Sequence, residues 1–202
     1  MRLWLLGGLA VLVQLGSGCS SVPGDAALRG GHPDQAAKLY QRGAQQGDAA
    51  AALRLGFLLD QGLVSAEKYG EAGDWFKKGC SLGNLPSCHN AGVAYEEGKN
   101  GFAKNHAEAR AYYLKAATAG YMQSQYNLAS LYSNGYVTPS NDVEGLKWML
   151  LSQAAAKKCS SQGLCQWILE DPPGHKRRLE SRLSSAQQQE SALLAKDWKP
   201  AR

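Results

Sequence analysis

Five cysteines carry most of the reactive chemistry in this 202-residue sequence, and their number is odd. They stand at Cys19, Cys80, Cys88, Cys159 and Cys165. Thiols pair in an oxidising compartment, so an odd cysteine needs a role of its own. Once Cys19 is set apart, the other four form two pairs that are close in sequence. Neither pair has the CxxC spacing of a zinc or redox site, so we expect disulfides and no metal.

The first residues have the features of an export signal, which gives Cys19 that separate role. A short positive start precedes an apolar run over residues 3–15, which is too short for a comfortable transmembrane helix. A Gly-Ser-Gly stretch then allows two cleavage sites. In one, a signal peptide of residues 1–18 is removed and Cys19 carries lipid. For that site Leu15 lies one place too far upstream to match the usual lipobox. In the other, an ordinary signal peptidase cuts the small-x-small site, Gly16-Ser17-Gly18.

Cysteine parity favours the lipidated form. The start of the mature chain resembles bacterial lipoproteins, and Ser20 and Ser21 follow the cysteine where an Asp would favour the inner membrane. We therefore predict an outer-membrane-anchored lipoprotein of the periplasm, with membrane contact through the lipid. Residues 19–31 are predicted to form a lipidated, flexible linker. The alternative is a soluble periplasmic or secreted protein.

Signatures of catalysis are missing from the sequence. It contains no GxSxG, HExxH, Walker or GxGxxG motif, and its four histidines fall at unrelated positions. The net charge of +5 is modest and does not identify nucleic acid as a target. We predict no enzyme, no cofactor, no nucleic acid and no small-molecule substrate.

The elements that must position the cysteines come from a repeat of about 36 residues. Four positions of the repeat hold similar residues in three successive copies, and we call each such set a column. The columns are Gly47, Gly83, Gly120; Gly62, Gly98, Gly135; Ala36, Ala72, Ala109; and Tyr40, Phe76, Tyr113. Each copy predicts two helices, because apolar residues recur at helical spacing on both sides of the first glycine. That glycine suits a helix end, and Asp48 suits the next N-cap. One hairpin cannot bury its apolar face, whereas stacked hairpins can.

This pattern resembles the Sel1-like repeat family, relatives of the tetratricopeptide repeats. The best stretch covers residues 109–120. The resemblance implies an all-α fold, a right-handed α-solenoid of helix hairpins with a C-terminal capping helix. The predicted repeats span residues 32–158, as 32–62, 67–98, 105–135 and a partial copy, 142–158. Residues 159–202 are predicted to hold a disulfide loop and the capping helix.

Alignment of the copies explains one cysteine pair. Cys80 and Cys88 occupy the positions of Ala44 and Ala52, one on each helix beside the turn, where two small side chains should lie within disulfide range. Cysteine-rich Sel1-like proteins carry a staple at the same place. Cys159 and Cys165 are predicted to close a tight loop, although no repeat position fixes them.

Recognition should fall on first-helix residues that vary between copies, because in similar solenoids that helix lines the concave face. The candidates are Lys38, Gln41, Gln45, Asp74, Lys77, Ser81, Arg110, Lys147 and Ser152. The recurring Trp75, Tyr112 and Trp148 are instead expected in the core. The basic run that starts at His175 is expected to be the solvated first turn of the last helix.

The family suggests a non-enzymatic, protein-binding lipoprotein that faces the periplasm. The sharper hypothesis is an immunity protein against a secreted toxin that acts in the periplasm, such as a phospholipase effector. An envelope-assembly or peptidoglycan-associated adaptor is the alternative. A small cell-wall or β-lactam hydrolase is a third hypothesis, which would need side chains from different repeats to converge.

Overall fold

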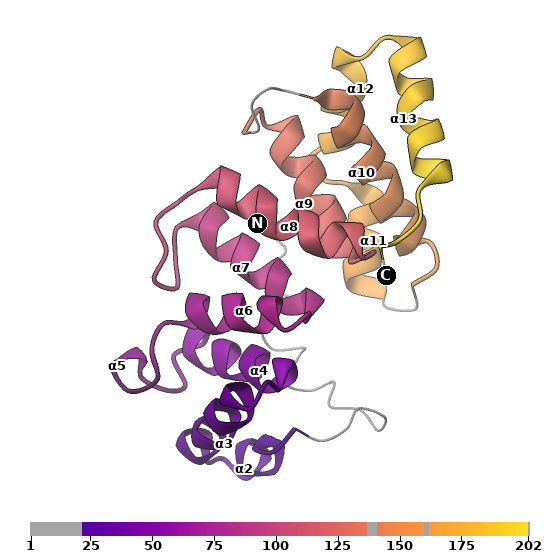
Figure 1. Cartoon of the computed structure of the whole chain (residues 1–202). Coiled ribbons are helices and arrows are strands. Elements are labelled where there is room, and N and C mark those ends of the chain that lie inside the picture. Colours follow the sequence, from indigo (N-terminus) through magenta and orange to yellow (C-terminus); the bar gives the residue numbers. More distant parts are fainter. Residues whose placement is uncertain (1–21, 137–140, 160–161, 202) are drawn as a thin grey trace. The chain divides into compact units, whose positions relative to one another are not determined.

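A computed structural model describes residues 22–136, 141–159 and 162–201, and every regular element in these ranges is a helix (Figure 1). The chain is therefore all-α, built from the predicted helix hairpins. It divides into two compact units, which meet in sequence between Lys104 and Asn105. The predicted signal peptide and Cys19 lie outside the described residues. None of the described helices is both long and apolar enough to cross a bilayer.

Unit 1 holds two helix hairpins with a short helix at each hairpin's start. Its helices are α2 (Asp25–Arg29), α3 (Pro33–Gln45), α4 (Ala49–Asp60), α5 (Ala66–Tyr69), α6 (Ala72–Ser81) and α7 (Leu85–Glu97). Helices α3 and α4 pack as one hairpin, α6 and α7 pack as the next, and α4 packs against α6 between them. Each hairpin thus buries its neighbour's apolar face, as stacked repeats require.

Unit 2 repeats the hairpin once and then adds four further helices. They are α8 (His106–Thr118), α9 (Met122–Ser133), α10 (Asp142–Ala156), α11 (Gln162–Glu170), α12 (His175–Arg182) and α13 (Ser185–Asp197). Helix α10 is the centre of this unit, because α9, α11, α12 and α13 all pack against it.

Each hairpin turn is built the same way. Gly47, Gly83 and Gly120 have φ angles of 94°, 86° and 91°, a left-handed conformation that side chains oppose. In the first turn Asp48 then caps α4, because its carboxylate accepts hydrogen bonds from the N–H groups of Ala50 and Ala51 at 2.8 and 3.0 Å. Glycine and cap together reverse the chain within a few residues.

The core column of the hairpins is the one that contains Tyr40, Phe76 and Tyr113, all buried. Close helix crossing depends on small partners: a Cβ on Gly56 of α4 would lie 2.5 Å from the Phe76 ring of α6. Of the neighbouring set expected in the core, Trp148 is buried and Trp75 packs against the core. Trp75 and Tyr112 are half-buried, because they stand one position round the helix from that face.

Two predicted segments are corrected at the ends of the repeats. Within the predicted linker 19–31, residues 25–29 form α2 and Asp25 is buried, so this part is folded. Within 159–202, Cys165 lies on a helix, α11, and the single capping helix is two helices. The break between α12 and α13 arises because Ser184 starts α13 with a capping box.

Candidate protein-binding surface

Helix α3 presents three of the predicted contact residues on one face. Lys38, Gln41 and Gln45 are three and four positions apart, so their side chains stack along the helix. Lys38 and Gln45 are exposed, and Gln41 is half-buried. The face points to solvent because the opposite one, with Ala37 and Tyr40, is in the core.

Helix α6 offers the equivalent face in the next hairpin. Asp74 and Ser81 are exposed. Lys77 is half-buried, and its Nζ lies 5.5 Å from the centre of the Phe102 ring, so part of its charge is used inside unit 1. Ser81 Oγ donates to the Lys78 carbonyl at 2.8 Å. We name the polar faces of α3 and α6, two helices that each pack on α4, the unit 1 surface. It consists of Lys38, Gln41, Gln45, Asp74, Lys77 and Ser81.

The candidates in unit 2 are placed differently. Arg110 Nε donates to the Tyr132 hydroxyl at 3.3 Å, and Lys147 pairs with Glu144 while its Nζ lies 4.1 Å from the centre of the Trp148 ring. Ser152 is fully buried and donates to the Met149 carbonyl, so its prediction as a contact residue is wrong. The structure therefore gathers the exposed candidates in unit 1.

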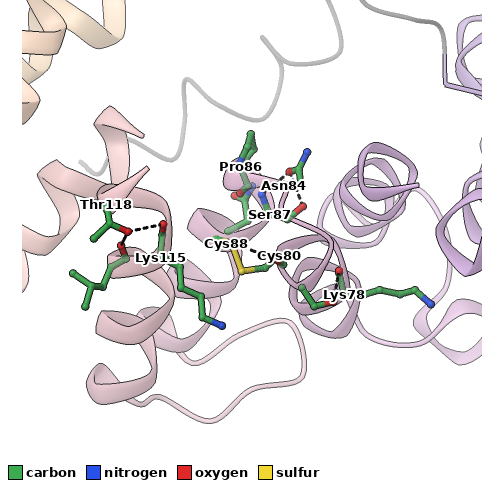
Figure 2. Close-up of a disulfide and its surroundings, with 11 residues drawn as sticks. Lys78, Cys80, Asn84, Pro86, Ser87, Cys88, Lys115 and Thr118 are labelled. Atoms are coloured by element: carbon green, nitrogen blue, oxygen red, sulfur yellow. Dashed lines mark hydrogen bonds between the residues drawn. A yellow bond between two sulfur atoms is a disulfide. The ribbon is translucent and has the colours of Figure 1, made fainter. Parts of the chain in front are cut away.

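Helix α6 is joined to α7 by a disulfide between Cys80 and Cys88, the pairing that the sequence predicts (Figure 2). The Cα atoms are 4.5 Å apart, and both cysteines are buried. Beside it, the Asn84 carboxamide oxygen accepts from the N–H and from the hydroxyl of Ser87, both at 2.8 Å. The staple and the cap fix α7 against the end of α6.

The second predicted disulfide joins Cys159 to Cys165 in unit 2. Cys165 is buried on α11, whereas Cys159 is exposed just after α10. This bond tethers α11 to the end of α10. Among the described residues, no group of three or more His, Cys, Asp or Glu side chains is placed to hold a metal ion.

A buried charged cluster that the sequence did not reveal lies at the start of unit 1. Asp25 accepts a hydrogen bond from the Tyr40 hydroxyl at 2.7 Å, and its carboxylate lies 2.6 Å from Arg54 Nε in an ion pair. Burial, together with the hydrogen bond to Asp25, raises the pKa of Tyr40 well above its usual range, so the hydroxyl stays a donor. Asp25 thus ties α2 to both α3 and α4.

A similar cluster lies in unit 2. Tyr126 of α9 donates to the Asp171 carboxylate at 2.8 Å, and the other carboxylate oxygen accepts from the Lys176 N–H at 2.8 Å. Burial and this hydrogen bond raise the pKa of Tyr126 far above its usual range. Asp171 adopts a φ of 44°, which lets it turn the chain between α11 and α12 while it caps α12.

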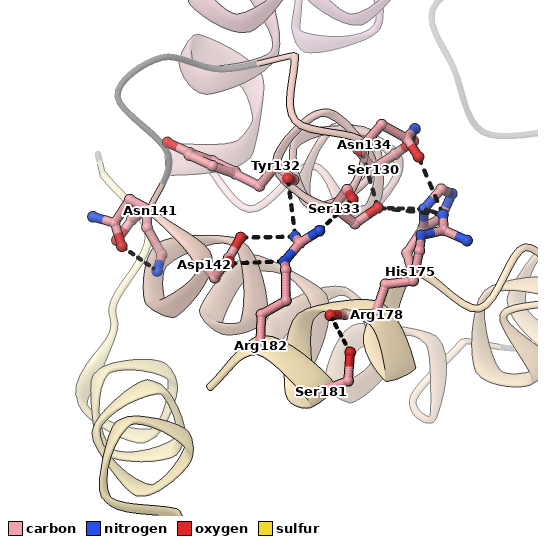
Figure 3. Close-up of polar contacts among 11 residues, drawn as sticks. Ser130, Tyr132, Ser133, Asn134, Asn141, Asp142, His175, Arg178, Ser181 and Arg182 are labelled. Atoms are coloured by element: carbon pink, nitrogen blue, oxygen red, sulfur yellow. Dashed lines mark hydrogen bonds and ion pairs between the residues drawn. The ribbon is translucent and has the colours of Figure 1, made fainter. Parts of the chain in front are cut away.

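Next to this cluster, Ser133 and His175 meet in the manner of a nucleophile and its base (Figure 3). Ser133 Oγ lies 2.6 Å from His175 Nδ1, and so does an N–H nitrogen of Arg178. A guanidinium only donates, so Nδ1 is an acceptor and the ring is neutral. Burial, with a contribution from Arg178, lowers the pKa of His175 to about 4.

That arrangement is structural rather than catalytic. Ser133 is 2% exposed, so no substrate reaches its hydroxyl. The Asp171 carboxylate accepts from Tyr126 and from a backbone N–H, whereas a triad would need it to orient the imidazole. The expectation of a solvated turn is therefore wrong for His175, which is buried and locks α12 onto α9, whereas Arg177 and Arg178 are exposed as expected.

Arg182 reinforces the same contact. Its guanidinium forms two hydrogen bonds to the Asp142 carboxylate, both at 2.8 Å, and donates to the carbonyls of Tyr132 and Ser133 (Figure 3). This forked geometry fixes α12 relative to α9 and α10. Asp171, His175 and Arg182 thus hold helices of unit 2 together.

Comparison with known proteins identifies the family of this repeat. A family model described as Sel1 repeat matches residues 33–48, 49–84, 85–121 and 123–157, more than half of the chain. The search of curated proteins gives no match.

Two solved structures share the fold. One is a protective antigen present in uropathogenic Escherichia coli strains that displays an SLR fold, with 27% identity and a TM-score of 0.65. The match covers 82% of this chain and 32% of the antigen. The other is a Sel1 repeat protein from Oxalobacter formigenes, with 21% identity and a TM-score of 0.58, over 83% of this chain and 65% of that one. This chain thus spans about a third of the antigen's length and under two thirds of the second protein's.

Proposed function

The chain belongs to the Sel1 repeat family, and on that premise we propose that it binds a partner protein through the α3 and α6 faces of unit 1. Sel1 repeats generally mediate protein–protein interaction and form non-catalytic scaffolds. The proposal adds which helices make the contact.

The observation that carries the proposal is the contrast between the predicted contact residues of the two units. Lys38, Gln45 and Asp74 are exposed on a disulfide-stapled unit, whereas Arg110 and Lys147 are held by aromatic rings and by Glu144. The staple presents the face of α6 on a preformed backbone, so binding there loses little backbone entropy. Opposite charges on Lys38 and Asp74 suit a partner surface that also carries both signs.

The partner we propose is a secreted toxin that acts in the periplasm, such as a phospholipase effector, which makes this chain an immunity protein. Two features support it: the predicted export signal with Cys19 as lipid anchor, and a stapled surface that needs no catalytic group of its own. An envelope-assembly or peptidoglycan-associated adaptor has the same requirements and is the alternative outcome.

The test is capture from a periplasmic extract, with a charge-swapped face and a matched control. K38E/D74K reverses two charges on the proposed surface, and E190K/K196E makes the same exchange at exposed positions of α13. We expect one partner at a one-to-one ratio, bound at least tenfold more weakly by K38E/D74K and normally by the control.

The identity of the captured protein decides the finer proposal. A toxin whose activity falls on binding supports immunity, and an envelope component supports the adaptor. Turnover of muropeptides or β-lactams by the purified chain, with no partner captured, would overturn the binding proposal.

The tether has its own test. With lipid on Cys19, C19A should move the protein from the outer-membrane fraction to the soluble periplasm, because a protein without its acyl chains loses their burial in the bilayer. A wild-type protein that is already soluble would instead indicate ordinary secretion.

A further inference from the structure

The segment that follows α13 lies on the turn of the α8–α9 hairpin. The Ala201 N–H donates to the Thr118 carbonyl at 2.7 Å. Thr118 is the last residue of α8, and the final carbonyls of a helix lack partners within it. Residues 198–201, which we name the tail segment, thus satisfy an acceptor that the hairpin leaves open.

Two side chains of the tail segment add apolar contacts. The Trp198 indole packs edge-on against Trp148 of α10, with ring centres 6.3 Å apart. A Cβ placed on Gly120 would lie 3.8 Å from both Trp198 and Pro200, so these side chains rest on the turn itself. The tail segment therefore binds as a short extended peptide, through a Trp, a Pro two residues later and one backbone N–H.

The repeat shows that the covered position is a surface elsewhere. Gly47 and Gly83 are the counterparts of Gly120, and a Cβ on either would meet no atom within 4 Å. Gln45 and Ser81 are the counterparts of Thr118, and both are exposed. The tail segment thus occupies a position of the third hairpin that unit 1 leaves uncovered.

The contacts of the tail segment leave one buried donor of its neighbour Trp148 without a partner. Trp148 is 2% exposed, and its indole Nε1 finds no hydrogen-bond acceptor among the described residues. A buried donor without a hydrogen bond lowers the stability of the folded state. Lys199, Pro200 and Ala201 are themselves exposed, so few contacts hold the tail segment down.

We propose that Thr118, Gly120 and Trp148 form a peptide-binding site that the tail segment fills in cis. A partner protein enters when it offers an extended segment with Trp and Pro two residues apart. This site is separate from the α3 and α6 faces, and it stands whether or not those faces bind a partner.

The test uses the full chain and a fluorescent peptide of residues 196–202, Lys-Asp-Trp-Lys-Pro-Ala-Arg. Two variants release the tail segment: W198A removes the ring on Trp148, and A201P removes the N–H that reaches Thr118. We expect both variants to bind the peptide at least tenfold more tightly than wild type. A tenfold gain corresponds to a tail segment that is docked about 90% of the time.

Controls separate this result from a general change in the protein. A peptide with Ala in place of its Trp should bind none of the three proteins, and far-ultraviolet circular dichroism should be the same for all. Ala201 is exposed beyond the last helix, so A201P tests the site even if W198A disturbs α10. Equal affinity for wild type and both variants, or no binding at millimolar peptide, overturns the proposal.

Discussion

In each compact unit a buried aspartate accepts a hydrogen bond from a buried tyrosine, but the two carboxylates are balanced differently. Asp25 of unit 1 faces the Arg54 guanidinium at 2.6 Å, a full opposite charge. Asp171 of unit 2 accepts instead from the Lys176 N–H at 2.8 Å, a neutral donor. Asp25 also accepts from the Val22 N–H at 3.2 Å, so the feature that distinguishes the two clusters is the ion pair with Arg54.

The difference matches what each cluster holds. Asp25 fastens a short helix, α2, onto the first hairpin, and few other contacts are available to so small an element. Asp171 stands at a chain turn, where its carboxylate caps α12, and His175 and Arg182 add further contacts to the same helix. A single strong pair suffices where the element is small, whereas several weaker bonds share the task where the element is longer.

The largest expected effect tests the role of charge. D25N removes the negative charge while its carbonyl can still accept from Tyr40, so Arg54 is left unpaired; we expect a loss of about 3 kcal/mol in unfolding free energy. D171N also keeps an acceptor, and Asn tolerates the positive φ, so we expect about 1–2 kcal/mol. Urea unfolding of both variants measures the difference.

A control for that comparison is Asp34, an exposed carboxylate of unit 1 that pairs with Lys68 at 2.6 Å. D34N removes the same charge at the surface and should leave the unfolding midpoint unchanged, because solvent screens exposed pairs. Equal losses for D25N and D171N would mean that the ion pair adds nothing to the hydrogen bonds.

Acid should act on unit 2 through His175. Its pKa is lowered to about 4, so the unfolded chain takes up a proton near pH 6.5, before the folded one does. Stability is therefore complete above about pH 6.5 and falls as the pH drops toward 4, by about 3 kcal/mol at most. We expect H175Q to lose part of this pH dependence in unfolding measured between pH 7 and 4.

Unit 1 supplies the matched variant. Burial lowers the pKa of His89 on α7 to about 4 as well, so H89Q should remove a separate part of the same pH dependence. The cluster of Asp25, Tyr40 and Arg54 contains no imidazole, so Y40F should leave the slope between pH 6.5 and 4 as in wild type. A slope that H175Q leaves intact would contradict the neutral, buried state of this ring.

The two disulfides extend the comparison to the covalent bonds of the units. C80A/C88A restores the residue type that the first hairpin has at Ala44 and Ala52, so it removes the bond with little change in packing; we expect about 2–3 kcal/mol. C159A/C165A opens a loop of similar length and should cost about 2 kcal/mol. Thermal unfolding of each variant, with reduced wild type as reference, measures both losses.

A reversed ranking would be informative. If C159A/C165A lost far more than C80A/C88A, the tether of α11 to α10 would be the main restraint in the molecule. The staple of unit 1 would then add little to the rigidity of the α3 and α6 faces, and the argument for a preformed surface would weaken.

The hairpins could be predicted from the sequence because each depends on residues that recur at a fixed period. Gly47 with Asp48, for example, specifies both a helix end and the next helix start, and Gly83 with Asn84 repeats both signals. Gly120 repeats only the helix end, because Tyr121 makes no side-chain cap. The Cys80 and Cys88 pair followed from the same register, since Ala44 and Ala52 mark where two helices cross closely.

What could not be predicted depends on residues outside the repeat. Asp25 lay in the predicted flexible linker and Asp171 outside the repeats, and neither role could be predicted because their tyrosine partners are distant in sequence. The Ser152 error has a physical cause that alignment could have shown: its counterparts are Ala116 and Gly79, small residues that are also buried. Variation between copies did not mean exposure, since a small buried position tolerates several residue types.

The smallest expected effect comes from removing the tyrosine hydroxyl that donates to each buried aspartate. Y126F leaves Asp171 with the Lys176 N–H, whereas Y40F leaves Asp25 with a guanidinium that still balances its charge. In the described part of the chain no guanidinium pairs with Asp171, so the loss of its tyrosine donor should lower the unfolding free energy more than the same loss at Asp25. We expect a loss of about 1–2 kcal/mol for Y126F and about 0.5–1 kcal/mol for Y40F. Both rings stay in place, so packing is the same and urea midpoints report the hydrogen bond alone. A larger loss for Y40F would show that the Arg54 pair is weaker than its 2.6 Å separation indicates, and that the tyrosine is the main partner of Asp25.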